Sequence, residues 1–432
     1  MCPNPANRKL TRMQTMNSSL NRLPEDFAAY TRELFGEERW ERYLASFNDT
    51  PPVSIRLNPF KATAGIGIPL SGTDKMPVPW CRNAWYLAER PDFTADPLLH
   101  AGIYYVQEAA SMFLDEMMRQ LPMPVEGRVL DLCAAPGGKS TLMRAVLADE
   151  VTLYSNEPNR KRANILMENM QKQGHHNVVV TNNFPADYQR AGMLFDMILT
   201  DVPCSGEGMF RKDAGSIEEW SLNGVMKCQQ LQREIVETIW PCLKEGGILI
   251  YSTCTFNTRE DEENVKWIMD TLGASPVAVS VQPEWQITGS LLKGFDAPVY
   301  RFIPGISKGE GLFMAVMRKT GGATLMEKTG RHAANGLHIL SDGNPKVTDK
   351  APAHAEALLA ALDRSRYPMV ELTLDDALRY LHREALVLPP DTPRGFVIVT
   401  YQNIPLGFMK NIGTRANNLY PQEWRIRRGV DH

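Results

Sequence analysis

Two cysteines in turn-like sequence contexts are the residues of this chain best suited to covalent chemistry. Cys204 lies in Asp-Val-Pro-Cys-Ser-Gly (201–206) and Cys254 lies in Tyr-Ser-Thr-Cys-Thr-Phe (251–256), each just after an apolar run. A thiolate that adds to C6 of a cytosine makes C5 enamine-like, so that this poor nucleophile can accept a methyl group. The C5 proton and the thiol must then both leave. The sequence therefore suggests a two-thiol reaction at a cytosine.

Burial alone explains many cysteines, because the small thiol side chain is a common core residue. Cys228 and Cys242, on a predicted helix, fit that explanation. Cys204 and Cys254 differ, since Pro, Ser, Gly or Thr surround them at predicted strand ends. An ordinary cysteine has a pKa of about 8.5, so a catalytic thiol needs a nearby base, a helix N-terminus or a cation such as Lys139.

Composition indicates a globular protein of roughly two to three domains, with 432 residues, 43% hydrophobic and 22% charged. No segment approaches the ~20 apolar residues of a membrane span, and residues 1–21 lack the apolar core of a signal peptide. The seven cysteines form no CxxC pair, which argues against a disulfide framework or a metal site. We therefore expect a cytoplasmic protein with reduced thiols and no bound metal.

The charge balance gives no support to nucleic-acid binding by itself. With 47 Lys+Arg against 50 Asp+Glu, the net charge is -3, so an RNA partner would need a local basic face. Basic residues cluster at 160–162, at Arg211 and Lys212, and at 425–428. Most such clusters are solvated surface, but Arg211 and Lys212 follow Cys204 closely and are the preferred candidates for phosphate contacts.

Helical and strand patterns divide the chain into four parts. A helical pattern over 23–47 precedes a short strand near 53–58, an α+β extension, whereas a Gly-, Lys-, Thr- and Asp-rich stretch later in the chain lacks apolar periodicity. Two helical stretches and two strands end the chain. We predict an extension at 1–105, a catalytic domain at 106–319, a linker at 320–351 and a small domain at 352–432.

Between residues 106 and 319 the patterns alternate between strand and helix, which predicts an α/β fold with a mostly parallel sheet covered on both faces. Ligands of such sheets bind at the carboxyl ends of the strands. The predicted strands are 128–132, 151–156, 178–181, 195–200, 248–252 and 311–319, and the predicted helices are 107–121, 140–147, 160–172, 225–243 and 260–271.

A glycine-rich turn, 131–140, connects the first of these strands to a helix. Its paired glycines let the backbone approach a ligand, and the helix N-terminus favours a carboxylate or phosphate. It is not a GxxxxGK[ST] phosphate loop, because Cys133 occupies the position of the first glycine. Glu157 ends the next strand and suits a ribose hydroxyl. A carboxylate that stabilises a helix N-terminus is the alternative, and both roles can hold.

Three motifs together resemble the Nol/Nop/Sun (NSUN-type) family of RNA 5-methylcytosine methyltransferases, most closely its bacterial RsmF-type ribosomal RNA branch. They are DLCAAPGGKS (131–140), DVPCSGEGMF (201–210) and YSTCTFNTRE (251–260). The resemblance covers roughly 23–319, and a weaker match over 406–424 is similar to the PUA-like tail of that branch. It implies a Rossmann-like S-adenosylmethionine-dependent methyltransferase core with an N-terminal RNA-binding extension and a C-terminal PUA-like RNA-binding domain.

The resemblance also implies roles for single residues. Cys254 would attack C6, and Cys204 would help remove the C5 proton and break the adduct. Asp201 would lie near both the cofactor and the cytosine edge. Glu157 would bind the ribose of S-adenosylmethionine, and Asn183 would face its adenine, where the family commonly has an acidic residue. The methionine side of the cofactor would be lined by Cys133, Ala134, Ala135, Pro136, Gly137, Gly138 and Lys139.

The implied function is methylation of cytosine C5 in ribosomal RNA, with 16S rRNA, alone or within the small subunit, as the expected partner of a monomeric enzyme. Methylation of another RNA such as tRNA is one alternative. A non-catalytic RNA-binding factor in ribosome assembly is another. A methyltransferase that acts on a protein or a small molecule would leave the two strand-end cysteines, Cys204 and Cys254, unexplained.

Overall fold

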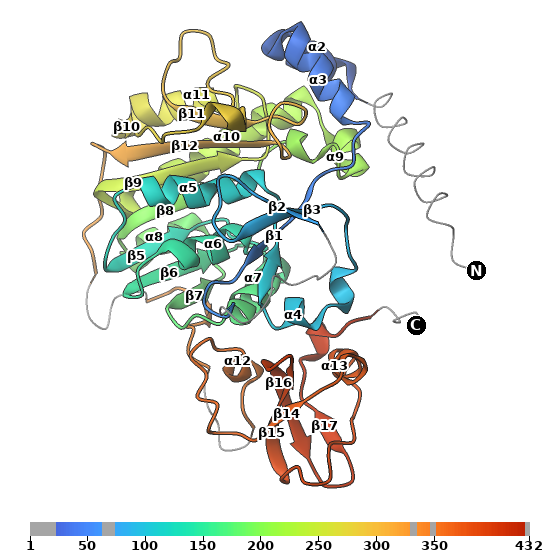
Figure 1. Cartoon of the computed structure of the whole chain (residues 1–432). Helices are drawn as coiled ribbons and strands as arrows, with labels where there is room; N and C mark the ends of the chain where they lie inside the picture. Colours follow the sequence, from blue (N-terminus) through green and yellow to red (C-terminus); the bar gives the residue numbers. More distant parts are fainter. Residues whose placement is uncertain (1–22, 63–73, 329–334, 346–350, 428–432) are drawn as a thin grey trace.

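The computed structural model describes residues 23–62, 74–328, 335–345 and 351–427 (Figure 1). The N-terminal part begins with α2 (Glu25–Phe35) and α3 (Glu37–Ser46). One helix was predicted here, but Gly36 takes a φ of 72°, which ends α2 and starts α3. A four-stranded sheet and the short helix α4 (Pro97–His100) follow; in the sheet order, the strands are β2 (Lys75–Pro77), β3 (Ala84–Leu87), β1 (Val53–Leu57) and β4 (Tyr104–Val106).

A nine-stranded sheet forms the centre of the molecule. Its path runs β10-β12-β9-β8-β5-β6-β7-β13, with β11 paired to β12. The five strands β5 to β9 pair parallel with one another, as predicted. The strands are β5 (Gly127–Asp131), β6 (Val151–Asn156), β7 (Val178–Thr181), β8 (Phe195–Asp201), β9 (Leu243–Thr253), β10 (Ala274–Pro276), β11 (Val299–Phe302), β12 (Leu312–Lys319) and β13 (Ile339–Ser341).

Helices cover both faces of this sheet. Along β5, Val129 packs with α5, α6 and α7, whereas Leu130 packs with α8, α10 and α11. The predicted helices are present with shifted ends; the last continues as a wider π turn over Ile268–Gly273, and α8 was not predicted because its apolar pattern is short. The helices are α5 (Phe113–Gln120), α6 (Gly138–Val146), α7 (Arg160–Gln173), α8 (Pro185–Ala191), α9 (Ala214–Glu219), α10 (Leu222–Ile239) and α11 (Glu262–Trp267).

The order of the parallel strands creates a switch point between β5 and β8. From β5 the chain moves outward through β6 to β7, whereas from β8 it moves the other way to β9. A crevice outside the carboxyl ends of the strands forms at such a point. Asp131 ends β5 and Asp201 ends β8, so the topology brings the residues that follow both strands to one edge.

The C-terminal part forms a separate sheet at the opposite end of the molecule from α2 and α3 (Figure 1). It packs on the N-terminal part. Tyr420 and Trp424 belong to the same buried hydrophobic cluster as Ile55, Leu98 and Tyr104. Within the described residues no helix is long and apolar enough to cross a membrane. Its elements are α12 (His354–Ala357), β14 (Met369–Glu371), α13 (Leu374–Leu381), β15 (Gly395–Tyr401), β16 (Ile404–Asn411) and β17 (Ala416–Asn418).

Part of the predicted linker is an edge strand of the central sheet. Within the described segment 335–345, β13 pairs antiparallel with β7. The backbone N–H of Asn182 donates to the backbone carbonyl of His338. Gly343 packs so closely on the His176 carbonyl that an added Cβ would lie 1.9 Å from its oxygen. This strand could not be predicted from the sequence, because three residues are too few to show a recognisable alternation of apolar and polar side chains.

Candidate active site

The two predicted thiols meet at the carboxyl ends of neighbouring strands. β8 and β9 are parallel with Asp201 opposite Ser252, so the turns that follow them run side by side. Cys204 Sγ lies 3.1 Å from Cys254 Sγ, and the Cys254 backbone N–H donates to Cys204 Sγ at 3.3 Å. Both side chains are free thiols. The pair can therefore exchange or share a proton directly.

The contact between the thiols changes their acidity. The hydrogen bond to Cys254, reinforced by burial and by the nearby Glu260, raises the pKa of Cys204 well above its ordinary value. A thiolate beside another thiol is stabilised by accepting its proton in a hydrogen bond. Cys204 is therefore the protonated partner of the pair before reaction.

Glu207 holds the two cysteine turns together. It follows Cys204 by three residues, and its Oε2 accepts hydrogen bonds from the backbone N–H groups of Phe256 at 2.8 Å and Asn257 at 3.1 Å. Its Oε1 accepts from the Asn257 side-chain amide at 3.0 Å and from the Trp220 indole at 3.1 Å. The carboxylate is buried. It therefore links one turn to the backbone of the other.

Glu260, which follows Cys254, connects its own turn to the backbone of the Cys204 turn. It lies six residues after Cys254, and its Oε2 accepts from the Ser205 backbone N–H at 3.0 Å. Its Oε1 accepts from the side-chain amide of Asn257 at 2.8 Å. Burial and the nearby Glu207 raise the pKa of Glu260 to about 7. The two carboxylates thus bracket Asn257 and fix the relative position of the thiols.

The N-terminal helices close over the Cys254 turn. Phe256 packs against Phe35 with ring centroids 5.8 Å apart and against Tyr43 at 5.6 Å. The Tyr30 hydroxyl accepts from the Thr258 backbone N–H at 3.1 Å. The extension is therefore part of the scaffold that positions the thiols.

The glycine-rich turn lies between β5 and α6, as predicted. Gly137 has a φ of 117°, which an L side chain rarely adopts, and an added Cβ would lie 3.3 Å from Leu166. Ser140 Oγ donates to Asp131 Oδ2 at 2.6 Å, but Asp131 Oδ1 is buried and no described residue donates to it. Burial raises the pKa of Asp131 to about 7. An external cationic donor would satisfy this carboxylate.

Lys139 and Asp201 connect the turn to the thiols. Lys139 Nζ donates to Asp201 Oδ2 at 2.8 Å. Burial alone would lower the pKa of Lys139, but the charge of Asp201, aided by Cys254 and Asp131, raises it. Lys139 therefore stays cationic within electrostatic range of Cys254.

Glu157 lies at the end of β6 with its side chain 3% exposed. Its Oε1 accepts from the Asn159 backbone N–H at 2.9 Å, and Oε2 lies 3.4 Å from Arg162 Nη1. Asn159 caps α7 with its own side chain, so Glu157 lies just before this helix and outside its first turn. The remaining acceptor positions of the carboxylate are compatible with the ribose role.

Asn183 is used by the chain itself. Its Oδ1 accepts from the His338 backbone N–H at 2.9 Å, and its Nδ2 donates to the His338 carbonyl at 3.2 Å. An adenine contact by Asn183 would have to share these atoms. The segment that carries β13 therefore borders the predicted adenine position.

Comparisons with known proteins agree with this geometry. The sequence model of 16S rRNA methyltransferase RsmB/F matches residues 119–318, that of the N-terminal domain of 16S rRNA methyltransferase RsmF matches 23–109, and that of the RsmF PUA domain matches 367–426. Ribosomal RNA small subunit methyltransferase F of Escherichia coli strain SMS-3-5 is 30% identical, over 93% of this chain and 96% of that protein. The chain belongs to the RsmB/F methyltransferase family.

Solved structures show the same fold. A methyltransferase homolog from Pyrococcus horikoshii is 25% identical, covers 73% of this chain and 100% of that one, and superposes with a TM-score of 0.59. NSun6 from the same organism is 20% identical, covers 69% and 98%, and has a TM-score of 0.58. The α/β core with an N-terminal part and a C-terminal PUA domain, predicted from the sequence, is confirmed.

Membership of the RsmB/F family establishes the reaction. The chain is an S-adenosylmethionine-dependent methyltransferase that acts on C5 of cytosine in ribosomal RNA, as the motifs indicated. In the part of the chain that the structure describes, no cluster of three or more His, Cys, Asp or Glu could hold a metal ion. The roles of single residues stay predictions.

The two basic candidates for RNA contacts differ in this RsmB/F chain. Arg211 Nη1 pairs with Glu310 Oε1 at 2.9 Å, and both side chains are at most 5% exposed. A phosphate contact by Arg211 would have to break this pair. Lys212 is exposed and lines a groove of about 1000 Å³ between the N-terminal sheet and the segment after Cys204, as do Arg90 and Lys308.

Sequence reasoning missed the residues that position the site. Glu207 and Glu260 both lie inside the motifs quoted above, at fixed distances from residues that were singled out. Acidic side chains in polar turns are usually solvated, so the burial of these carboxylates could not be predicted from the sequence. Their place within the motifs was the available signal.

Proposed function

We propose that this RsmB/F chain methylates a cytosine of 16S rRNA, with Cys254 as the nucleophile and Cys204 as the group that completes the reaction. The contact of 3.1 Å between the two thiols carries the proposal, because a single-thiol reaction needs no partner at that distance. The small-subunit target rests on the similar proteins of Escherichia coli, which are named ribosomal RNA small subunit methyltransferase F.

Cys254 is suited to attack because a cation and a second thiol lie close to its sulfur. The Lys139 ammonium lies within electrostatic range, and Cys204 can donate its thiol proton. The Cys254 sulfur forms a bond to C6, and the electron pair of the C5–C6 bond moves to C5. The target base must leave its stack to reach the thiol.

The residues present fit S-adenosylmethionine. The unpaired Asp131 Oδ1 matches a cationic amino group, and Glu157 offers acceptors for ribose hydroxyls. When bound, the cofactor supplies the methyl group that C5 takes. Asp201, held by Lys139, is placed near both the cofactor turn and the thiols, and we assign it the orientation of the cytosine edge.

Cys204 becomes a base once Cys254 has reacted. Its pKa is raised first by the hydrogen bond to Cys254 and also by the charge of that residue. A neutral thioether at Cys254 carries no negative charge and is a weak acceptor for the Cys204 proton, so both contributions shrink and the pKa of Cys204 falls. The Cys204 thiol then loses its own proton to solvent, and the resulting thiolate takes the C5 proton. The C5–C6 double bond re-forms, and the sulfur–C6 bond breaks to return the Cys254 thiolate.

The groove that contains Lys212 and the C-terminal PUA domain both support RNA binding by this protein. We propose phosphate contacts by Lys212, with Arg211 contributing only where its pair with Glu310 opens. A monomeric, cytoplasmic enzyme that acts on rRNA or on the small subunit fits these features and the bacterial relatives.

The target is tested by bisulfite sequencing of RNA treated with the protein and S-adenosylmethionine. Naked 16S rRNA, small-subunit particles and tRNA serve as substrates, with Cys254→Ala as the inactive control. We expect a protected cytosine in 16S rRNA, naked or assembled, with the wild type alone. Protection only in tRNA, or none in any RNA, would contradict the proposal.

A further inference from the structure

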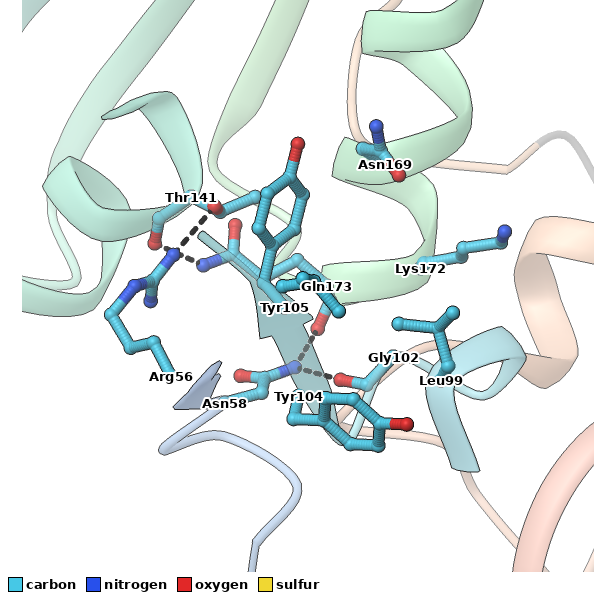
Figure 2. Close-up of a pocket in the computed structure, with 11 residues that line it drawn as sticks. Arg56, Asn58, Leu99, Gly102, Tyr104, Tyr105, Thr141, Asn169, Lys172 and Gln173 are labelled. Atoms are coloured by element: carbon cyan, nitrogen blue, oxygen red, sulfur yellow. Dashed lines mark hydrogen bonds between the residues drawn. The ribbon is translucent and has the colours of Figure 1, made fainter. Parts of the chain in front are cut away.

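A second cavity lies at the junction of the N-terminal sheet and the methyltransferase core (Figure 2). It has a volume of about 180 Å³ and is bounded by β1, β4, α6 and α7. A single water needs only ~15 Å³ of such volume, so the space suits a planar ring. None of the residues assigned above to the cofactor or to the thiols lines it.

The floor of the cavity holds an unsatisfied acceptor. Gln173 is 4% exposed, and its Nε2 donates to the Thr141 carbonyl at 2.6 Å. Its Oε1 is buried, and no described residue donates to it. Arg56, which also lines the cavity, donates from Nη2 to Thr141 Oγ1 at 2.7 Å. A buried amide oxygen without a partner costs about 1–3 kcal/mol, so this site is built to accept a hydrogen bond from a ligand N–H.

The wall and mouth of the cavity point to an aromatic ligand from RNA. Tyr105 is half-buried, and its ring stands between α6 and α7 (Figure 2). Val106 lines both this cavity and the groove that contains Lys212, so the two spaces adjoin across β4. Bases stack on aromatic side chains in proteins that bind single-stranded nucleic acid.

The geometry points to a binding site for one unpaired nucleobase that carries an amino group, donated to Gln173 Oε1 and packed on Tyr105. The source is a nucleotide of the RNA substrate, which rests on the function proposed above; a free nucleotide would offer the same chemistry. The site also adjoins the cofactor turn, because Asn169 Nδ2 donates to the Pro136 carbonyl at 2.8 Å.

The experiment uses the full chain and two variants that alter the cavity. Leu99→Trp fills it from the rim, and Tyr105→Leu removes the stacking face. Val125→Trp, at an exposed site before β5, is the matched control. Equilibrium dialysis measures binding of AMP, CMP and UMP, and filter binding measures a 16S rRNA fragment. Ultraviolet cross-linking with mass spectrometry reports whether RNA is joined to the peptide that contains Tyr105.

We expect both cavity variants to weaken RNA binding by roughly 5- to 150-fold, as loss of one stacked base predicts, while Val125→Trp binds normally. AMP and CMP should bind better than UMP, and RNA should displace them. Displacement by RNA assigns the site to the substrate, whereas binding without displacement assigns it to a free nucleotide. Wild-type affinity for nucleotides and RNA in both variants, with no cross-link, would overturn the inference. Binding is measured without methyl transfer, so failure of the proposed methylation is seen separately.

Discussion

Cys204 Sγ lies 3.1 Å from Cys254 Sγ although the two residues are 50 positions apart in the chain. Parallel pairing of β8 and β9 brings their turns together, and two buried carboxylates then lock them. The distance is therefore a product of the fold and of specific hydrogen bonds.

The first prediction concerns Glu207 as a positioning residue. Glu207→Gln places an N–H group against the N–H donors of Phe256 and Asn257, so the two turns should separate. We expect kcat to fall by about 10²-fold, as small misplacement of reacting groups does. Affinity for S-adenosylmethionine, measured by calorimetry, should not change. Glu219→Gln, on the exposed face of α9, should retain activity; an equally active Glu207→Gln protein would refute the role.

The second prediction concerns cofactor affinity. Glu157→Gln removes the charged acceptor assigned to the ribose, and a hydrogen bond to a charged group is worth about 1.5–3 kcal/mol. The dissociation constant for S-adenosylmethionine should therefore rise roughly 10- to 150-fold. Glu150→Gln, at an exposed position before β6, is the control and should bind normally. Unchanged affinity in Glu157→Gln would leave Glu157 with only its contacts to Asn159 and Arg162.

The third prediction is a pH dependence that arises from Asp131. Burial raises its pKa to about 7, so the carboxyl is mostly protonated at pH 6 and ionised at pH 8. A cationic amino group favours the ionised form, so affinity for S-adenosylmethionine should increase as the pH rises through 7. Calorimetry at pH 6 in buffers of different ionisation enthalpy should show proton release on binding. Asp131→Asn should show neither effect, and a flat profile in the wild type would disprove the assignment.

The fourth prediction concerns the support beneath Cys254. Arg301 pairs with Asp261 at 3.1 Å and with Glu262 at 2.7 Å, all fully buried, and Asp261 in turn accepts from Thr253 Oγ1 at 2.6 Å. Arg301→Met would strand two buried carboxylates and should lower the free energy of unfolding by about 3–5 kcal/mol.

The control for this prediction is Arg32→Met, because the Arg32 pair with Glu37 is largely exposed and should matter little. Urea unfolding of both variants measures the difference. An Arg301→Met protein as stable as the wild type would show that the buried cluster does not support the end of β9.

The sequence was sufficient to place the thiols, because strand-ending residues of a parallel sheet converge by topology alone. Cys204, Cys254 and the cofactor turn could be found in this way. The burial of Glu207 and the pairing of Arg211 with Glu310 could not, since both depend on contacts between segments far apart in the chain.

The edge strand β13 of the central sheet was missed for a related reason. β13 is short, and its docking is decided by Asn183 and Gly343 packing on distant backbone rather than by its own apolar pattern. The roles of the two cysteines also do not follow from spacing. They depend on the contacts that each thiol makes in the folded chain.

The most direct test of the two-thiol mechanism is the fate of the covalent RNA adduct. Each variant is incubated with 16S rRNA and labelled S-adenosylmethionine and analysed on a denaturing gel. Cys204→Ala can form the sulfur–C6 bond but lacks the base that releases it, so a denaturation-resistant, labelled protein–RNA species should accumulate. Cys254→Ala should form none. Accumulation in Cys254→Ala and not in Cys204→Ala would contradict the assignment and reverse the two roles.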